Sequence, residues 1–97
     1  MYDIHFDHPV WVHFIGIGGI SMSGLAEILH DRGFKVSGSD MKASPLTEHL
    51  ESLGISVQFP QKSENIVPGI ELCVYTAAIS EDNPEFQEVK RQNIPMM

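Results

Sequence analysis

Residues 11–29, WVHFIGIGGISMSGLAEIL, pass from an apolar run into a cluster of glycines and then into a segment with apolar residues at helical spacing. The first part is rich in β-branched and aromatic residues, as buried strands are, and the last part has the period of an amphipathic helix. The stretch therefore predicts a strand, a tight turn and a helix. Gly16 and Gly18 allow backbone angles closed to other residues and let a ligand approach the main chain.

A helix that starts in such a turn presents unpaired backbone N–H groups and the positive end of its dipole. We expect this turn to bind a phosphate or diphosphate through the backbone. The alternative is that the glycines only make a tight connection. The dinucleotide fingerprint has a third glycine, but Ser21 stands in its place and the next glycine is Gly24. This departure disfavours a nicotinamide or flavin cofactor.

Composition indicates one small domain over residues 1–97, with 42% apolar residues and no apolar run long enough to span a membrane. Thirteen acidic and 6 basic residues give a net charge of -7, which argues against nucleic-acid and anionic-membrane partners. The single cysteine, Cys73, lies in an apolar run and is expected to be a buried thiol. Residues 1–9 do not resemble a secretion signal, so we expect a cytoplasmic protein.

Strands and helices alternate along the whole chain. The expected strands cover residues 11–15, 34–40, 56–59 and 72–75, with a fifth beginning in residues 93–97. The expected helices cover residues 19–31, 45–53 and a stretch from Asn83–Pro84 onward, with one helical turn possible in residues 62–69. This alternation predicts an α/β fold, a Rossmann-like open parallel sheet of about five strands in the order 3-2-1-4-5 with helices on both faces.

Apolar spacing also predicts which helix faces are buried. In the first helix the core face is expected to consist of Met22, Leu25, Ala26 and Leu29. In the second helix it is expected to consist of Leu46, Leu50 and Leu53.

Asp40 ends the second expected strand. In a right-handed strand-helix-strand unit both strands end at the same edge, so Asp40 should lie beside the glycine turn and accept hydrogen bonds from ribose hydroxyls. The alternative is that Asp40 only starts a turn. The small residues 76–80 after the fourth strand should reach the same edge. His5, Asp7 and His8 are of metal-ligating types, but nothing nearby completes a coordination set, so we expect no metal site.

Three motifs in register resemble the N-terminal domain of the Mur ligases. They are HFIGIGG and MSG within residues 13–24, SGSD at residues 37–40, and TAAI at 76–79 with DNPE at 82–85. The family usually has serine where Thr76 or Ala77 stands. The ligases that recycle murein tripeptide share the fold but typically carry cysteine at the position of Gly18, so they are a second choice within the family.

The resemblance implies that the chain binds the uridine diphosphate part of UDP-N-acetylmuramate, for ATP-dependent ligation of L-alanine in peptidoglycan synthesis. The resemblance and the glycine turn together imply a set of residues that bind the uridine diphosphate. They are Gly16, Gly18, Gly19, Ile20, Ser21, Met22, Ser39, Asp40, Thr76, Ala77 and Ala78. In the family, ATP and Mg²⁺ are bound in a central domain that follows, and a third domain helps to bind the amino acid. The sequence has no Gly-x-x-x-x-Gly-Lys-Thr/Ser motif. Residues 1–97 are therefore expected to be an N-terminal fragment that binds no cofactor and is not catalytic alone.

Two other functions remain open from the residues themselves. Asp40 would also suit an NAD(P)-binding domain of an oxidoreductase. The bare domain length would also suit a ligand-sensing module that regulates a transporter.

Overall fold

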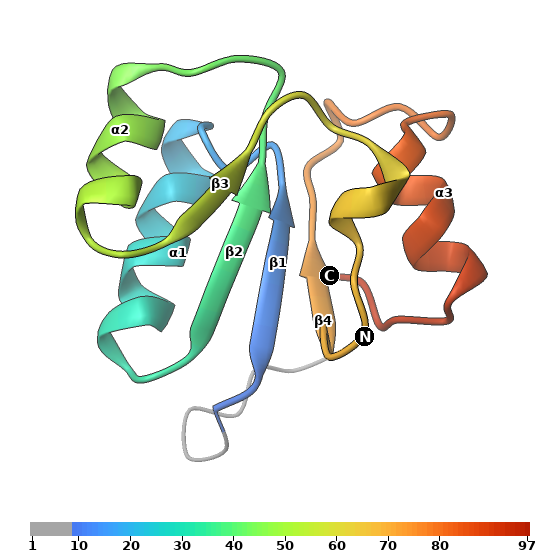
Figure 1. The fold of residues 1–97 in the computed structure, drawn as a ribbon, viewed down its shortest axis with the longest axis horizontal. Coiled ribbons are helices and arrows are strands. Elements are labelled where there is room, and N and C mark those ends of the chain that lie inside the picture. The colour runs from blue at the N-terminus through green and yellow to red at the C-terminus, as the bar shows by residue number, and fades with distance from the viewer. Residues whose placement is uncertain (1–8) are drawn as a thin grey trace.

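The computed structural model describes residues 9–97, and in this part of the chain a parallel sheet lies between two layers of helices (Figure 1). The strands are β1 (Trp11–Ile15), β2 (Lys35–Ser39), β3 (Ser56–Gln58) and β4 (Leu72–Val74). The helices are α1 (Ile20–Asp31), α2 (Pro45–Ser52), the short 3₁₀ helix η1 (Ser63–Asn65) and α3 (Pro84–Arg91). This arrangement confirms the predicted Rossmann-like α/β fold.

β1 is a central strand of the sheet, whose order is β3-β2-β1-β4. Phe14 of β1 pairs with Gly38 of β2 on one side and with Val74 of β4 on the other, and all pairings are parallel. The chain first builds the sheet outward through β2 and β3 and then returns to the other side of β1. In open α/β sheets such a reversal of strand order marks the ligand-binding edge, at the carboxyl ends of the strands.

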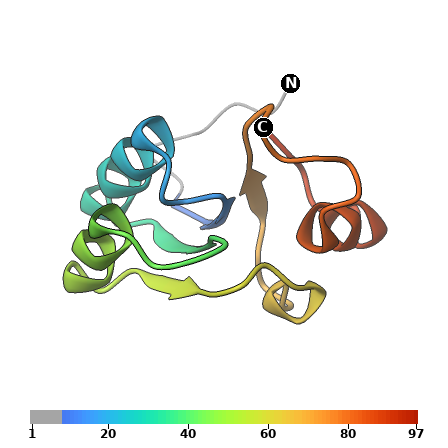
Figure 2. The same ribbon diagram turned by 90° about the horizontal axis from the view of Figure 1, so that it is seen from above.

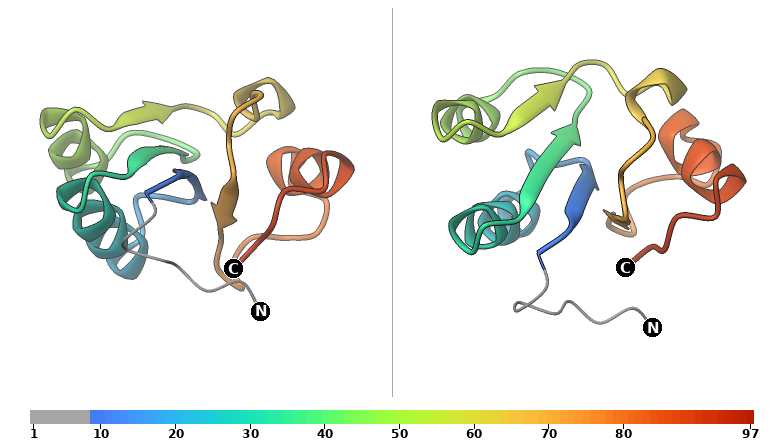
Figure 3. Two further views of the ribbon diagram at one scale, coloured as in Figure 1. Left: turned by 90° about the horizontal axis from the view of Figure 1, so that it is seen from below. Right: turned by 60° about the horizontal axis from the view of Figure 1, so that its bottom comes forward.

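Helices cover both faces of the sheet, with α1 and α2 on one face and α3 with η1 on the other (Figure 2). The view from below shows the same division (Figure 3). Val12 and Phe14 pack in the core beneath α1 and α2, whereas Ile15 packs with Phe86 and Val89 of α3. Successive side chains of a strand point to opposite faces, so β1 is buried on both sides, which explains its continuous apolar run.

The fifth strand of the expected order is reduced to one bridge within the described residues, where Cys73 pairs in parallel with Met96. Cys73 donates its N–H to the carbonyl of Pro95 and accepts from the N–H of Met97, both at 2.9 Å. These residues occupy the place predicted for the fifth strand, beside β4. The sheet therefore has four strands where about five were expected.

The buried face of α2 differs from the prediction at Leu46, which is 37% exposed, while Thr47 is fully buried. A capping box fixes the rotation of this short helix: Thr47 Oγ1 accepts from the N–H of Ser44, and Ser44 Oγ accepts from the N–H of Thr47. This geometry turns Thr47 inward and Leu46 outward. Leu50 is buried as expected, and Leu53 is half-buried.

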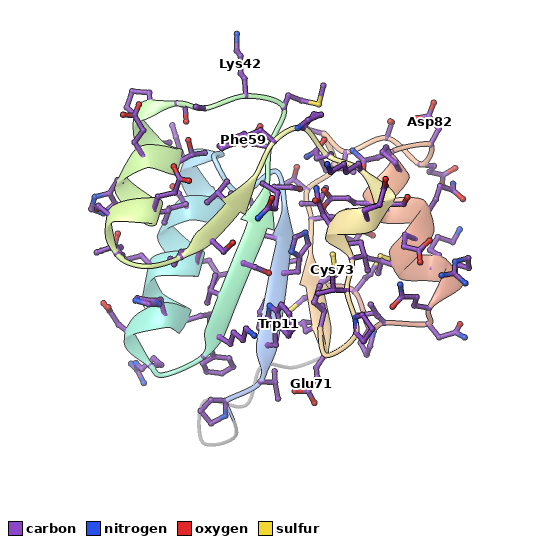
Figure 4. All side chains as sticks on the ribbon, viewed as in Figure 1. Trp11, Lys42, Phe59, Glu71, Cys73 and Asp82 are labelled. Carbon is purple, nitrogen blue, oxygen red and sulfur yellow. The ribbon has the colours of Figure 1, made fainter. Side chains whose placement is uncertain are left out.

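In α1 the expected core face is confirmed, since Ala26 and Leu29 are buried and Met22 and Leu25 pack partly buried against them. Cys73 is a buried free thiol, also as expected (Figure 4). Burial raises the pKa of this thiol to about 12, and the nearby Glu85 carboxylate acts in the same direction.

None of the helices in residues 9–97 has the length and apolar character needed to cross a membrane. The same residues contain no group of three or more His, Cys, Asp or Glu side chains that would suit a metal ion. The three residues considered above as metal ligands, His5, Asp7 and His8, lie outside the described part of the chain.

Candidate functional site

The glycine turn is fixed to the end of β2 by its backbone. The N–H groups of Gly16 and Ile17 both donate to the carbonyl of Ser39 at 2.9 Å, and the N–H of Gly19 donates to the carbonyl of Gly16 at 3.2 Å. Gly16 has a φ of 85°, in the left-handed region that side chains disfavour, so this position of the turn requires glycine. The turn is thus rigidly placed at the carboxyl edge of the sheet.

The N-terminus of α1 is open. Gly19 is its N-cap and provides no side-chain cap, and the first turn holds no acidic residue. The N–H groups of Ile20, Ser21 and Met22 form no hydrogen bond with any other residue among 9–97. These donors and the helix dipole together favour an anion at this position.

The other two α-helices are capped by side chains. The capping box described above closes the N-terminus of α2. Asn83 closes α3, because its Oδ1 accepts from the N–H of Glu85 at 2.9 Å and of Phe86 at 3.2 Å. Within the described residues, α1 is therefore the α-helix whose N-terminal donors remain available.

A cavity of about 420 Å³ opens beside this helix end, at the carboxyl edge of the sheet. Its lining comes from the glycine turn, the end of β2, the loop after β3 and the segment after β4. The predicted site residues in the lining are Gly16, Gly19, Met22, Asp40, Thr76 and Ala78. The lining residues that sequence reasoning missed are Met41, Gln61, Ile79, Ser80 and Asn83.

Ile20, Ser21 and Ala77 are predicted site residues that lie outside the lining, exposed on the surface next to lining residues. Ser39 is fully buried, and its hydroxyl donates to Glu85 Oε1 at 2.6 Å rather than facing the cavity. Its contribution to the site is the carbonyl that holds the glycine turn.

Gly18 also lies outside the lining. The space that a side chain would occupy at this position is filled by atoms of Asp40 and Thr47. A Cβ atom at Gly18 would lie 2.5 Å from Asp40 Oδ2 and 3.0 Å from Thr47 Cγ2. The N–H of Gly18 donates to Asp40 Oδ2 at 2.8 Å. This glycine therefore allows the turn to pack against β2 and α2.

Asp40 lies beside the glycine turn, where the strand-helix-strand topology placed it. Its Oδ2 accepts from Gly18, and its Oδ1 accepts from the N–H of Met41 at 2.8 Å. Each carboxylate oxygen can accept a second hydrogen bond, so Asp40 keeps acceptor capacity toward the cavity that it lines. Among the lining residues Asp40 alone carries a charge, and Lys42 extends outward from the following loop (Figure 4).

Gln61 and Asn83 join two loops across the cavity wall. Asn83 Nδ2 donates to Gln61 Oε1 at 2.9 Å, which ties the start of α3 to the loop after β3. Both side chains are amides, and amides both donate and accept hydrogen bonds. The cavity thus presents backbone N–H groups, one carboxylate and two amides, a set that suits an anionic ligand with a polar ring or sugar.

Residues 11–97 match the family model described as Mur ligase family, catalytic domain. The UDP-N-acetylmuramate–L-alanine ligase of Lachnoclostridium phytofermentans is 59% identical over 97 residues, which are 100% of this chain and 21% of that protein. The chain thus spans about a fifth of the length of such relatives.

The crystal structure of UDP-N-acetylmuramate–alanine ligase from Thermotoga maritima superposes with a TM-score of 0.86 at 33% identity, over 90% of this chain and 20% of that one. The UDP-N-acetylmuramate:L-alanyl-γ-D-glutamyl-meso-diaminopimelate ligase from Neisseria meningitides superposes with a TM-score of 0.84 at 29% identity, over 93% of this chain and 28% of that one. The sequence match, the sheet and the glycine turn agree with one another, and this chain belongs to the Mur ligase family.

Proposed function

We propose that the chain binds the uridine diphosphate part of UDP-N-acetylmuramate, as part of a ligase that joins L-alanine to this substrate in peptidoglycan synthesis. The observation that carries the proposal is the open N-terminus of α1 beside the cavity. The relative from Lachnoclostridium phytofermentans and the structure from Thermotoga maritima, both named as UDP-N-acetylmuramate–alanine ligases, support the choice of substrate.

The backbone is the part of this site that suits a diphosphate. The chain has a net charge of -7, and no Lys or Arg lines the cavity. Peptide N–H groups at a helix start bind phosphate without a cationic side chain. The diphosphate is therefore assigned to the N–H donors of Ile20, Ser21 and Met22.

The polar side chains of the cavity suit the rest of the nucleotide. Asp40 is assigned to ribose hydroxyls, which can donate to a carboxylate. Gln61 and Asn83 offer amide groups on the opposite loops, where a uracil ring can exchange hydrogen bonds. A cavity of about 420 Å³ falls within the size range of small-molecule sites.

ATP and Mg²⁺ are proposed to bind in parts of the ligase outside these 97 residues. Residues 9–97 do not fit them: the cavity has a single carboxylate, and the described residues offer no metal-binding cluster. The residues present here bind and orient the nucleotide sugar. The proposed location is the cytoplasm, where ATP and nucleotide sugars are available.

Calorimetric titration of the 97-residue chain tests the proposal, with UDP-N-acetylmuramate, uridine diphosphate and NAD as separate ligands. We expect binding of both uridine nucleotides and none of NAD. Tighter binding of NAD would refute the assignment of the site, and substrate-dependent phosphate release from ATP by the same chain would refute the proposed division of labour.

A further inference from the structure

Glu85 is a fully buried carboxylate at the start of α3 that does not line the cavity. Its Oε1 accepts from His13 Nε2 at 2.8 Å and from Ser39 Oγ at 2.6 Å. Its Oε2 accepts from Asn65 Nδ2 at 2.7 Å and from the N–H of Lys62 at 3.1 Å. One side chain thus joins β1, the end of β2, η1 and the loop before η1.

The Glu85 carboxylate is held in its ionised form. Burial by itself raises the pKa of Glu85, but the hydrogen bonds from His13, Asn65 and Ser39 outweigh it, and the pKa lies below its ordinary value. A buried charge costs free energy unless its donors are all in place, so this cluster has one favourable arrangement.

Two partners of Glu85, Ser39 and Lys62, are next to residues of the cavity wall. Ser39 holds the glycine turn through its carbonyl, which accepts from Gly16 and Ile17. Lys62 follows Gln61, and Gln61 accepts from Asn83 at 2.9 Å. Glu85 therefore lies where the glycine turn, the loop after β3 and the start of α3 are fastened together.

A chain of hydrogen bonds continues from Glu85 along the sheet. Trp11 Nε1 donates to Ser37 Oγ at 2.9 Å, and Ser37 Oγ lies 2.9 Å from His13 Nδ1. The Glu85 carboxylate can only accept, so the hydrogen of that contact belongs to His13 Nε2, and the Ser37 hydroxyl, which accepts from the indole, can donate to Nδ1. The imidazole then carries its hydrogen on Nε2, the nitrogen that faces Glu85. All members of the chain are satisfied in this arrangement.

We propose that Glu85 is a positioning residue of the nucleotide site, which sets the spacing between the glycine turn and the Gln61–Asn83 wall through its hydrogen bonds to Ser39, Lys62 and Asn65. This inference rests on the proposed function, because it assigns the spacing to nucleotide binding. Glu85 itself touches no ligand. Its effect reaches the cavity through the backbone of Ser39 and through the two loops.

Glu85→Gln tests the proposal with a side chain of the same shape. The amide keeps one acceptor oxygen and turns an NH₂ donor toward two former donors. On the side of His13 and Ser39 this donor can be accepted, provided that His13 moves its hydrogen to Nδ1. We expect ¹⁵N spectra of the imidazole to report this change of tautomer, the Gly16 and Ile17 amide signals to move, and affinity for UDP-N-acetylmuramate to fall about tenfold.

Glu88→Gln is the matched control. Glu88 lies on the same helix and pairs with Arg91 and Gln92 at the surface, outside the cluster. We expect this variant to leave the His13 tautomer, the Gly16 and Ile17 amides and the affinity unchanged. If Glu85→Gln does not fold, Asn65→Ala tests the proposal in its place. This variant removes one partner of Glu85 at a half-exposed position outside the cavity lining. We expect it to lower the affinity for UDP-N-acetylmuramate severalfold.

The outcomes separate the two proposals. A wild-type chain that does not bind UDP-N-acetylmuramate refutes the proposed function, and the tautomer and amide signals of Glu85→Gln still test the positioning role. A wild-type chain that binds, with unchanged affinity and unchanged Gly16 and Ile17 signals in a folded Glu85→Gln or Asn65→Ala variant, overturns the positioning role alone.

Discussion

Replacement of Gly19 by Ala should weaken diphosphate binding while leaving the fold intact. Gly19 has φ -65° and ψ 151°, angles open to any residue, and a Cβ atom there would meet its nearest neighbours at 3.6 Å (Gly16 O) and 3.8 Å (Met22 Cγ). These are ordinary contacts. Ala at an N-cap is poorer than Gly by up to about 1 kcal/mol, and the lower entropy of the unfolded chain offsets this by about 0.4–1 kcal/mol. The free energy of unfolding should therefore change by less than about 1 kcal/mol.

The expected loss of affinity follows from the place of Gly19 in the cavity lining. A methyl group at the start of α1 keeps an anion from reaching the N–H groups of the first turn. Hydrogen bonds to charged groups contribute about 1.5–3 kcal/mol each, so losing one weakens binding about ten- to hundredfold. The measurement is a calorimetric titration with uridine diphosphate, with thermal unfolding followed in parallel by circular dichroism.

Gly24→Ala is the matched control, since it adds the same methyl group to α1 outside the cavity lining. Gly24 is an exposed residue within α1 with nothing within 4 Å of its Cβ position. Ala in a helix interior is favoured over Gly by about 1 kcal/mol, which raises the melting temperature of a domain of this size by about 4–8 °C. Affinity should not change. Wild-type affinity in a folded Gly19→Ala chain would refute the assignment of the diphosphate to this helix end.

Three further predictions concern stability and reactivity. Gly18→Ala should lower the free energy of unfolding by about 1–3 kcal/mol, because its Cβ atom meets Asp40 Oδ2 at 2.5 Å; an unchanged melting temperature would contradict this packing. Cys73 should react with iodoacetamide at pH 8 only after denaturation, because the thiol is buried and its pKa is raised to about 12; rapid alkylation of the native chain would be inconsistent with that. The lowered pKa of Glu85 contributes stability that is present above its ordinary pKa of 4.5 and is lost as the pH falls through its lower folded-state pKa. Urea unfolding between pH 7 and pH 3 should therefore show a shallower loss of stability in Glu85→Gln than in the wild type, and equal slopes would show that Glu85 does not drive the acid sensitivity.

The strands, the helices and the glycine turn can be predicted from local sequence patterns, because each depends on residues close together in the chain. These patterns also place Asp40 beside the turn, since the handedness of the strand-helix-strand unit fixes which strand ends meet. The exposure of Leu46 could not be predicted from local patterns, because the capping box, rather than apolar spacing, sets the rotation of α2.

The remaining features depend on tertiary contacts. Gln61 reaches the cavity because Asn83, from a distant part of the chain, holds it there. Glu85 reads in the sequence as an acid in the first turn of a helix, where the dipole favours it at the surface. Its burial depends on four hydrogen-bond donors that come from separate segments of the chain. No local sequence pattern predicts that these donors meet.

The proposed phosphate site, made from peptide N–H groups in an acidic chain, has a consequence for the rate of ligand association. Sites lined by Lys and Arg attract anions from a distance, and salt slows their association with ligand. Here the chain carries a net charge of -7, so a uridine diphosphate is repelled until it reaches the short-range donors of α1. Salt shortens the range of that repulsion from about 30 Å at 0.01 M to about 8 Å at 0.15 M. The association rate constant should therefore increase with ionic strength, opposite to the behaviour of a basic phosphate site.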